Sequence, residues 1–457
     1  MLKISQFNNI NFPITEQKKC KELSTNTIQS KEEKQNFVQY SAENLKAYIP
    51  SFSAKQKETN STNNIPSRNQ QIRTIKSKLD KNSQLLLNRL EQNGILDDNN
   101  SNDGSTVLDN LYKIATEPRI RGLSDTLIIT EVLKALDNPF SITQKFGDIP
   151  ENVAKAIEQE TGEIIPEKAK NVVSSSCVVA SMEFNLASKK PAEFVRFAQG
   201  LSSNNYSVTK NIKMSDISSG VAEGLWKLRE FNTESELNNW EDITIKLKPD
   251  RNAIVRARVQ TSYKDPNERS CIDVLIQSAL LNLGSQNTYD AIIDERTGKF
   301  NPDKSGLTDF EKTFVEEVVF ENPKISVVYQ NLDENGYLTG YNCEPQETKQ
   351  HILKSLELGQ NVIVGYTHLD ENNKVDGGHE ITIIGYEKDE NGKGFFICND
   401  TDDNKDAPVS ISEETLLPLI HHAGISKEAL NQNDYIVEPW REYLEQIKKD
   451  FTNNKAA

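Results

Sequence analysis

Apolar residues recur at helical spacing between about residues 71 and 165. Ser124 is placed to cap the last helix of this stretch, and Pro139 is placed to end it. The predicted helices cover 72–90, 107–114 and 127–136, with a polar loop over 97–104. The pattern therefore predicts a helical region, either a plain structural domain or a prosegment-like cover for the next domain.

Beyond about residue 166, helical and strand-like patterns alternate. The predicted helices are 177–199, 271–283, 310–319 and 351–358. The predicted strands are 325–330, 361–367, 379–386 and 394–398. A turn at Asn391-Gly392 joins the last two strands and makes them antiparallel, whereas 203–248 gives no clear pattern.

The first 70 residues are dominated by Asn, Gln, Ser, Thr and Lys. Such a segment buries too little apolar surface to offset its chain entropy, so we expect a disordered tail, or otherwise a secretion or partner-binding arm. The expected organisation is a tail over 1–70, a helical region over 71–165, a mixed domain over 166–440, and a C-terminal helix and tail over 441–457.

Composition and charge narrow the function classes. The chain has 457 residues, 36% of them hydrophobic, and a net charge of -15, which predicts a globular protein without a nucleic-acid or anionic-membrane surface. No run is long and apolar enough to span a membrane, and the N-terminus lacks the apolar stretch of a Sec signal peptide. We therefore expect a cytoplasmic protein or one exported by a non-Sec route.

The five cysteines and five histidines do not form the usual metal-binding motifs. The cysteines are scattered without a CxxC pair, and neither HExxH nor a glycine-rich phosphate loop occurs. His421-His422 is expected to be a surface or capping pair, and the acidic loop over 400–406 a solvated one. No metal and no cofactor is therefore expected.

Cys177 is the leading candidate for a nucleophile. It follows Ser174-Ser175-Ser176 and opens a predicted apolar helix. Serine caps helices well, and the positive end of a helix dipole favours the reactive thiolate over the thiol. The pattern thus favours a thiol-dependent reaction.

His379 is the candidate base. It follows Gly377-Gly378 at the start of a predicted strand, and the next hairpin returns the chain alongside that strand. The return brings either Asn399 or Asp400 close to the imidazole, where it could orient the ring.

These segments together resemble the papain-like cysteine peptidase superfamily, and in particular the bacterial leader-cleaving peptidases of peptide exporters. The resemblance rests on Asn171-Val-Val-Ser-Ser-Ser-Cys177-Val-Val-Ala-Ser181, on Gly359-Gln-Asn-Val-Ile-Val364, and on Gly378-His379 with Ile384-Gly385-Tyr386, within about 166–410. It implies an α+β fold in which the cysteine helix packs on an antiparallel sheet. It also implies a cysteine peptidase that cleaves peptide bonds in a polypeptide substrate. In such an enzyme Cys177 would be the nucleophile, His379 the base, Asn399 or Asp400 the orienting residue, and Asn171 with the Cys177 N–H the oxyanion donors.

Three departures from the family pattern leave alternatives open. Asn171 stands where the family has glutamine, and Val178 where papain has tryptophan. Cys177 and His379 lie 379 − 177 = 202 residues apart, against about 130–150 in papain, which predicts an insertion within about 205–330. The alternatives are an inactive peptide- or protein-binding module, a transglutaminase-like acyl transferase, and Cys271 as the nucleophile.

Overall fold

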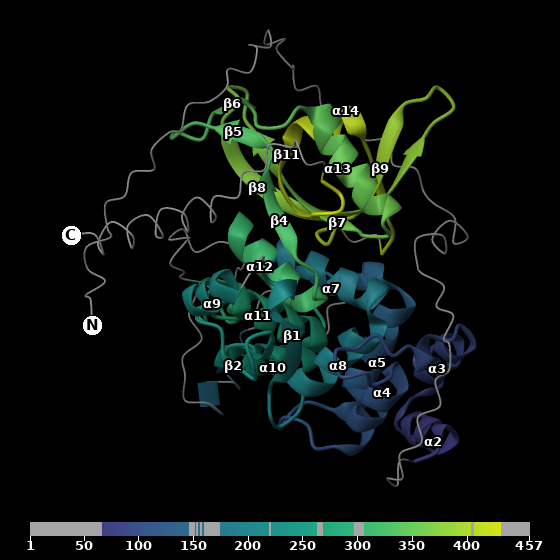
Figure 1. Ribbon diagram of the computed structural model, residues 1–457. Coiled ribbons are helices and arrows are strands. Elements are labelled where there is room, and N and C mark those ends of the chain that lie inside the picture. Colours follow the sequence, from purple (N-terminus) through teal and green to yellow (C-terminus); the bar gives the residue numbers. More distant parts are fainter. Residues whose placement is uncertain are drawn as a thin grey trace, which may run out of the picture.

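The structure is a computed structural model that describes residues 66–145, 151, 154–155, 158–159, 174–218, 221–262, 268–296, 306–403 and 406–430. Most of the predicted tail and the predicted C-terminal helix lie outside the described residues. The architecture is mixed α+β with antiparallel sheets. In Figure 1 the largest sheet fills the upper half of the view and most helices fill the lower half.

Four helices form the N-terminal part, and their ends follow the polar residues of the sequence. They are α2 (Arg68–Lys78), α3 (Lys81–Gln92), α4 (Val107–Thr116) and α5 (Asp125–Asp137). Ser124 accepts a hydrogen bond from the Leu127 N–H, and a 3₁₀ turn beginning at Pro139 follows α5. The Ser124 cap and the helices predicted over 107–114 and 127–136 are therefore confirmed, whereas the helix predicted over 72–90 is two helices that separate at Leu79-Asp80. Most of 146–165 lies outside the described residues.

The predicted helix over 177–199 is two helices, α7 (Cys177–Lys189) and α8 (Pro191–Leu201). Proline lacks the N–H that a helix interior needs, but it suits a first turn, so Pro191 separates the two. The helix predicted over 271–283 is α11 (Cys271–Gly284), and Ser270 with Asp273 forms a capping box at its N-terminus.

The stretch that gave no pattern folds around a small sheet. Its strands β1 (Val208–Lys213), β2 (Ser235–Leu237) and β3 (Asp242–Leu247) are antiparallel in the order β1-β3-β2, and α9 (Val221–Glu230) and α10 (Arg251–Ser262) accompany them. Buried and exposed residues alternate along β1, as expected for a strand with one covered face.

The main sheet carries the C-terminal half. Its order is β10-β9-β8-β7-β11-β4, and all neighbours are antiparallel. The strands are β4 (Lys324–Val328), β7 (Val362–Leu369), β8 (Val375–Lys388), β9 (Gly394–Asn399), β10 (Val409–Ser412) and β11 (Ile420–Ser426). The remaining elements are α12 (Asp309–Phe320), α13 (Pro345–Glu357), α14 (Glu413–Leu416) and the hairpin of β5 (Gln330–Leu332) with β6 (Leu338–Tyr341).

Three hairpins of this half close with the same device. In each turn one aspartate carboxylate accepts the backbone N–H groups two and four residues later, and a left-handed residue follows. The aspartates are Asp333, Asp370 and Asp389, and the left-handed residues are Gly336, Asn373 and Gly392. The turns at Asp370 and Asp389 lie at the two ends of β8, the strand that carries His379, and help to fix its register.

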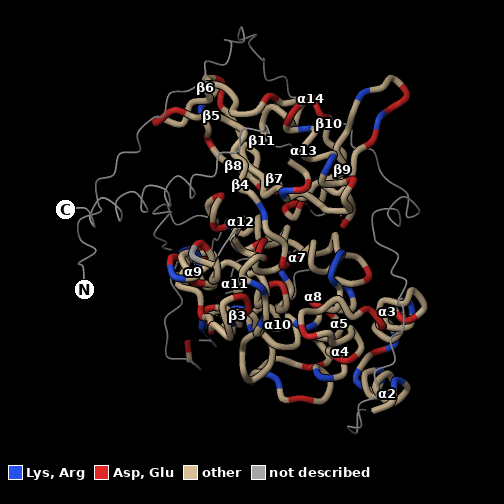
Figure 2. The backbone as a smooth tube through the Cα atoms, in the orientation of Figure 1, with Lys and Arg blue, Asp and Glu red and all other residues tan. Residues whose placement is uncertain are grey.

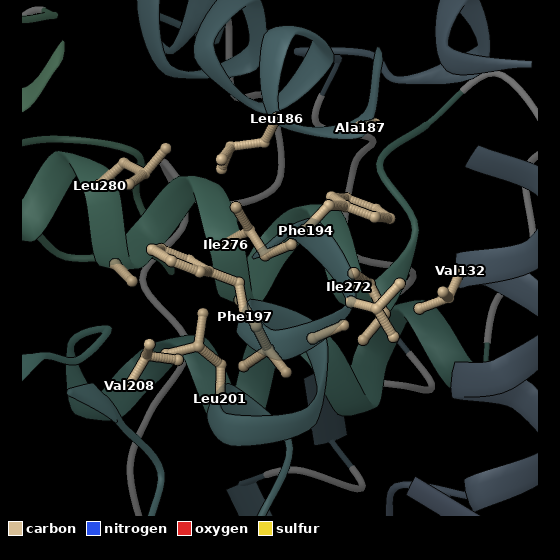
Figure 3. Close-up of a cluster of buried hydrophobic side chains, with 14 of the residues drawn as sticks. Val132, Leu186, Ala187, Phe194, Phe197, Leu201, Val208, Ile272, Ile276 and Leu280 are labelled. Carbon is tan, nitrogen blue, oxygen red and sulfur yellow. The ribbon is translucent and has the colours of Figure 1, made fainter. Parts of the chain in front are cut away.

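Two large apolar cores and one small cluster (Ala154, Val259 and Ile292) are buried among the described residues. One lies in the sheet half and includes α13. The other is continuous from α2–α5 through α7, α8 and α11, and Figure 3 shows Val132 of α5 beside side chains of those helices. The N-terminal helices therefore share one core with the helix that begins at Cys177.

Helices α7 and α12 lie where the two halves meet (Figure 1). Helix α7 packs on β7 and β8, and α12 packs on β4 and β11. Basic and acidic residues are interspersed over both halves (Figure 2). An ion pair spans the junction: Nζ of the buried Lys312 on α12 lies 2.6 Å from Oε2 of the partly buried Glu380 on β8. Since Glu380 neighbours His379, this pair fixes the strand next to the candidate base.

Candidate active site

Cys177 is the first residue of α7, at the junction of the two halves. Its side chain is partly exposed, whereas Cys271, Cys343 and Cys398 are buried. The helix has 13 residues, so its dipole places partial positive charge at the sulfur end. Among the cysteines that the structure describes, Cys177 is therefore the one open to a reagent.

The serine run before Cys177 does not cap α7 as expected. Ser176 occupies the cap position, but its side chain makes no capping hydrogen bond. Its hydroxyl instead accepts from Arg269 and donates to Oε1 of Gln277 at 3.3 Å. The prediction of a serine cap is wrong because a buried guanidinium and an amide compete for the hydroxyl.

His379 and Asp400 meet at one end of the sheet. Nε2 of His379 lies 2.8 Å from Oδ1 of Asp400, which also accepts the backbone N–H of Asp402 at 2.9 Å. Asn399 instead points elsewhere: it pairs with Thr382 in the sheet register and is buried, and its amide nitrogen has no hydrogen-bond partner among the described residues. Of the two residues left open by the sequence, the structure brings Asp400 to the ring.

The electrostatics of this pair favour a charged imidazole. Burial alone would lower the pKa of His379, but the hydrogen bond to Asp400 and the nearby Cys177 side chain in its thiolate form raise that pKa to about 10. Burial likewise would raise the pKa of Asp400, whereas the hydrogen bond to His379 and the charge of its ring bring it below its ordinary value. His379 thus interacts with a carboxylate on one side and with the thiol of Cys177 on the other.

Tyr366 forms a wall of the same site and was missed by the sequence reading. It lies opposite His379 in the pairing of β7 with β8, and the two rings meet edge to face at 5.7 Å between centroids. Burial and the nearby negative charge of Asp400 hold the pKa of Tyr366 above its usual range. The signal that could have found it is the antiparallel pairing of the two predicted strands.

The rival nucleophile Cys271 is in a different setting. Its thiol is buried and donates to Oε2 of Glu131 at 2.8 Å, and the Ile272 N–H donates to the same oxygen. A buried thiol in this setting has no access to a substrate unless α11 moves. Burial also raises the pKa of Cys398, as expected for a structural cysteine, while Cys20 and the predicted oxyanion residue Asn171 lie outside the described residues.

His421-His422 is not a surface pair on a helix. The two residues belong to β11, and His422 is fully buried with Nε2 2.7 Å from the Ser326 hydroxyl. The prediction failed because the apolar residues before the pair form a 3₁₀ turn that leads into a central strand. In the part of the chain that the structure describes, no three His, Cys, Asp or Glu side chains form a group that could hold a metal ion.

Searches for relatives returned no matching family model, no matching curated protein and no matching solved structure. Within the described residues, no helix is long and apolar enough to cross a membrane. The resemblance inferred from the residues around Cys177 and His379 therefore stays a hypothesis, and the geometry of the site carries the functional argument.

Proposed function

We propose that the protein is a thiol-dependent hydrolase of papain-like type that cleaves peptide bonds through Cys177, His379 and Asp400. The observation that carries the proposal is the position of His379. Its ring bonds the Asp400 carboxylate at 2.8 Å. It is also near enough to Cys177, a partly exposed cysteine at a helix N-terminus, for that side chain to raise its pKa. A nucleophile, a base and a residue that orients the base are the parts such a reaction needs.

The proposed reaction divides into two halves. The Cys177 sulfur, ionised by proton transfer to His379, attacks the carbonyl carbon, and the imidazolium then gives its proton to the departing amine. Water next attacks the thioester, His379 accepts its proton, and the sulfur leaves as the carboxylic acid is released. Asp400 keeps the proton on Nε2, so that Nδ1 is the atom that exchanges protons with the sulfur.

The oxyanion needs donors that are already in place. The backbone N–H of Cys177 lies in the first turn of α7, where N–H groups have no partner within the helix. Asn171 is the proposed second donor. If an amine attacked the thioester instead of water, the product would be an amide and the reaction an acyl transfer. A hydrolase and a transferase therefore differ in which molecule attacks the thioester.

The test is labelling with a thiol-reactive peptide electrophile, mapped by mass spectrometry. Wild type should react at Cys177 near neutral pH, and His379→Ala should lower the labelling rate by about a hundredfold or more. The matched control is His368→Ala, which removes an exposed histidine that packs on the same Tyr366 ring. Labelling at Cys271 would show that the nucleophile is wrongly assigned. If no cysteine reacts faster than a free thiol, the result would contradict the proposal and favour a binding module.

A further inference from the structure

A short strap (Thr143–Lys145) runs from the N-terminal helices to the residue after Asp400. The Gln144 N–H and the Thr143 hydroxyl each donate to the Thr401 carbonyl at 3.0 Å, and the Thr401 hydroxyl donates to Oε1 of Gln144 at 3.1 Å. Thr401 is buried, with 1% of its surface exposed. Three hydrogen bonds therefore hold the backbone next to the carboxylate that orients His379.

The other side of the strap is held by two residues of the helical half. Nε of Arg269 donates to the Gln144 carbonyl at 2.8 Å, and the Arg269 N–H donates to the Lys145 carbonyl at 2.9 Å. The Gln277 side chain donates to the Thr143 carbonyl at 3.0 Å. Every carbonyl of the strap thus accepts from Arg269 or Gln277.

The same two side chains hold the loop before the nucleophile. The second arm of Arg269, Nη2, donates to the hydroxyls of Ser174 and Ser176, and Gln277 accepts from Ser176. Asp294 also holds this loop, since its carboxylate accepts the Ser175 N–H at 2.9 Å and lies 3.6 Å from Nη2 of Arg269. A continuous chain of buried hydrogen bonds therefore connects the residue before Cys177 to the residue after Asp400.

We propose that Arg269 and Gln144 are positioning residues that hold the Cys177 thiol in register with the His379–Asp400 pair, an inference that rests on the proposed function. The thiol comes from the helical half and the imidazole from the sheet half, so their separation depends on how the halves are fixed. A misplacement of about 1 Å is enough to cost about a hundredfold in rate. We call this chain of contacts, from Ser176 through Arg269 and Gln277 to Gln144 and Thr401, the brace. It also explains the serine run, because hydroxyls of that run bind Arg269 and Gln277 rather than capping α7.

The planar guanidinium is what makes the brace possible. Its Nε and Nη2 point at acceptors in two different segments at fixed angles, whereas a lysine offers a single point charge. Arg269→Lys keeps the charge near Asp294 and should lose one side of the brace. Thr401→Val keeps the side-chain volume and removes only the hydroxyl that bonds Gln144.

The experiment measures the rate of Cys177 alkylation against pH in folded full-length protein. Arg269→Lys should lower the rate near neutral pH by about tenfold or more, Thr401→Val by less, and both should shift the pH profile toward that of a free thiol. The double variant should be no slower than Arg269→Lys alone, because both changes break the same chain of contacts. The matched control is Arg196→Lys, which alters a buried guanidinium that bonds Glu193 in the same core, and its pH profile should equal that of wild type.

The outcomes separate the two proposals. One outcome would overturn the brace alone. In it the wild type reacts in a His379-dependent way, but Arg269→Lys and Thr401→Val keep its rate and pH profile, and the proposed hydrolase function is then retained. An equal loss in Arg196→Lys, or independent multiplicative losses in the double variant, would also overturn it. Wild type without His379-dependent reactivity would remove the proposed function, and the brace with it.

Discussion

At the scale of single residues, the site depends on which of two neighbouring side chains reaches the imidazole. Asp400 does so at 2.8 Å, while Asn399 is buried within the sheet opposite Thr382. A carboxylate at this position stabilises the imidazolium more than an amide would, because it carries a full negative charge. The protonation state of His379 is therefore the property most sensitive to substitution here.

Asp400→Asn should lower the pKa of His379 from about 10 by one unit or more, because the hydrogen bond and charge that raise it are weakened. The measurement is NMR titration of the His379 ring, assigned by comparison with His379→Ala. The control is Asp402→Asn, which changes an exposed carboxylate two residues away and should leave the midpoint unchanged. An unchanged midpoint in Asp400→Asn would contradict the role assigned to this carboxylate.

The raised pKa of His379 also predicts how the free energy of unfolding changes with pH. The folded pKa of His379, about 10, lies above its unfolded value of about 6.5. Its contribution to the free energy of unfolding is therefore fully present below about pH 6.5 and is lost as pH rises toward 10. Chemical denaturation of wild type and His379→Ala should show a difference that shrinks across that range, and a difference that is constant with pH would contradict it.

At the scale of elements, sequence reasoning succeeded where one helix face or one hairpin was decisive. It predicted α5 with its Ser124 cap, α11, and the β8–β9 hairpin that returns to His379. It could not choose between Asn399 and Asp400, because a bulge between Ile383 and Gly385 shifts the register. It overlooked Tyr366, which the pairing of β7 with β8 could have indicated. It could not place Arg269, whose contacts with Gln144 and Ser176 join segments far apart in the chain.

The contact between α5 and α11 makes a prediction at this scale. Burial raises the pKa of Glu131 to about 7. Ionising this carboxyl therefore lowers the free energy of unfolding, and the loss is absent below about pH 4.5 and complete above about pH 7. Glu131→Gln keeps an acceptor for the Cys271 thiol and the Ile272 N–H without that loss. Its free energy of unfolding should therefore rise relative to wild type between pH 4.5 and 7, as measured by urea denaturation. The exposed Glu371→Gln is the control, and an E131Q difference that does not change with pH would contradict the prediction.

At the scale of the whole molecule, the N-terminal helices share one apolar core with the helices of the next region, which argues against the prosegment hypothesis. Residues of α2–α5 are buried against α7, α8 and α11, and Val132 packs in the cluster of Figure 3. The strap after α5 also contacts the site. We therefore expect the helical region to be part of the folded unit rather than a removable cover.

A chain that starts at residue 166 should accordingly fail to unfold cooperatively, because it leaves large apolar faces of α7, α8 and α11 in water. Thermal unfolding followed by near-UV circular dichroism tests this. A chain that starts at residue 66 keeps every described core residue and serves as the control. A chain from residue 166 that folds and labels faster than full length at Cys177 would restore the prosegment hypothesis.

The order of strands in the main sheet has a consequence for how the protein is made. Strand β11 is the last described strand to leave the ribosome, yet it lies between β7 and β4 in the interior of the sheet. Until it arrives, β7, which carries Tyr366, presents an open edge to other nascent chains. The thiol of Cys177 is synthesised more than two hundred residues before that strand, so the main sheet cannot be completed around the site until β11 has been made.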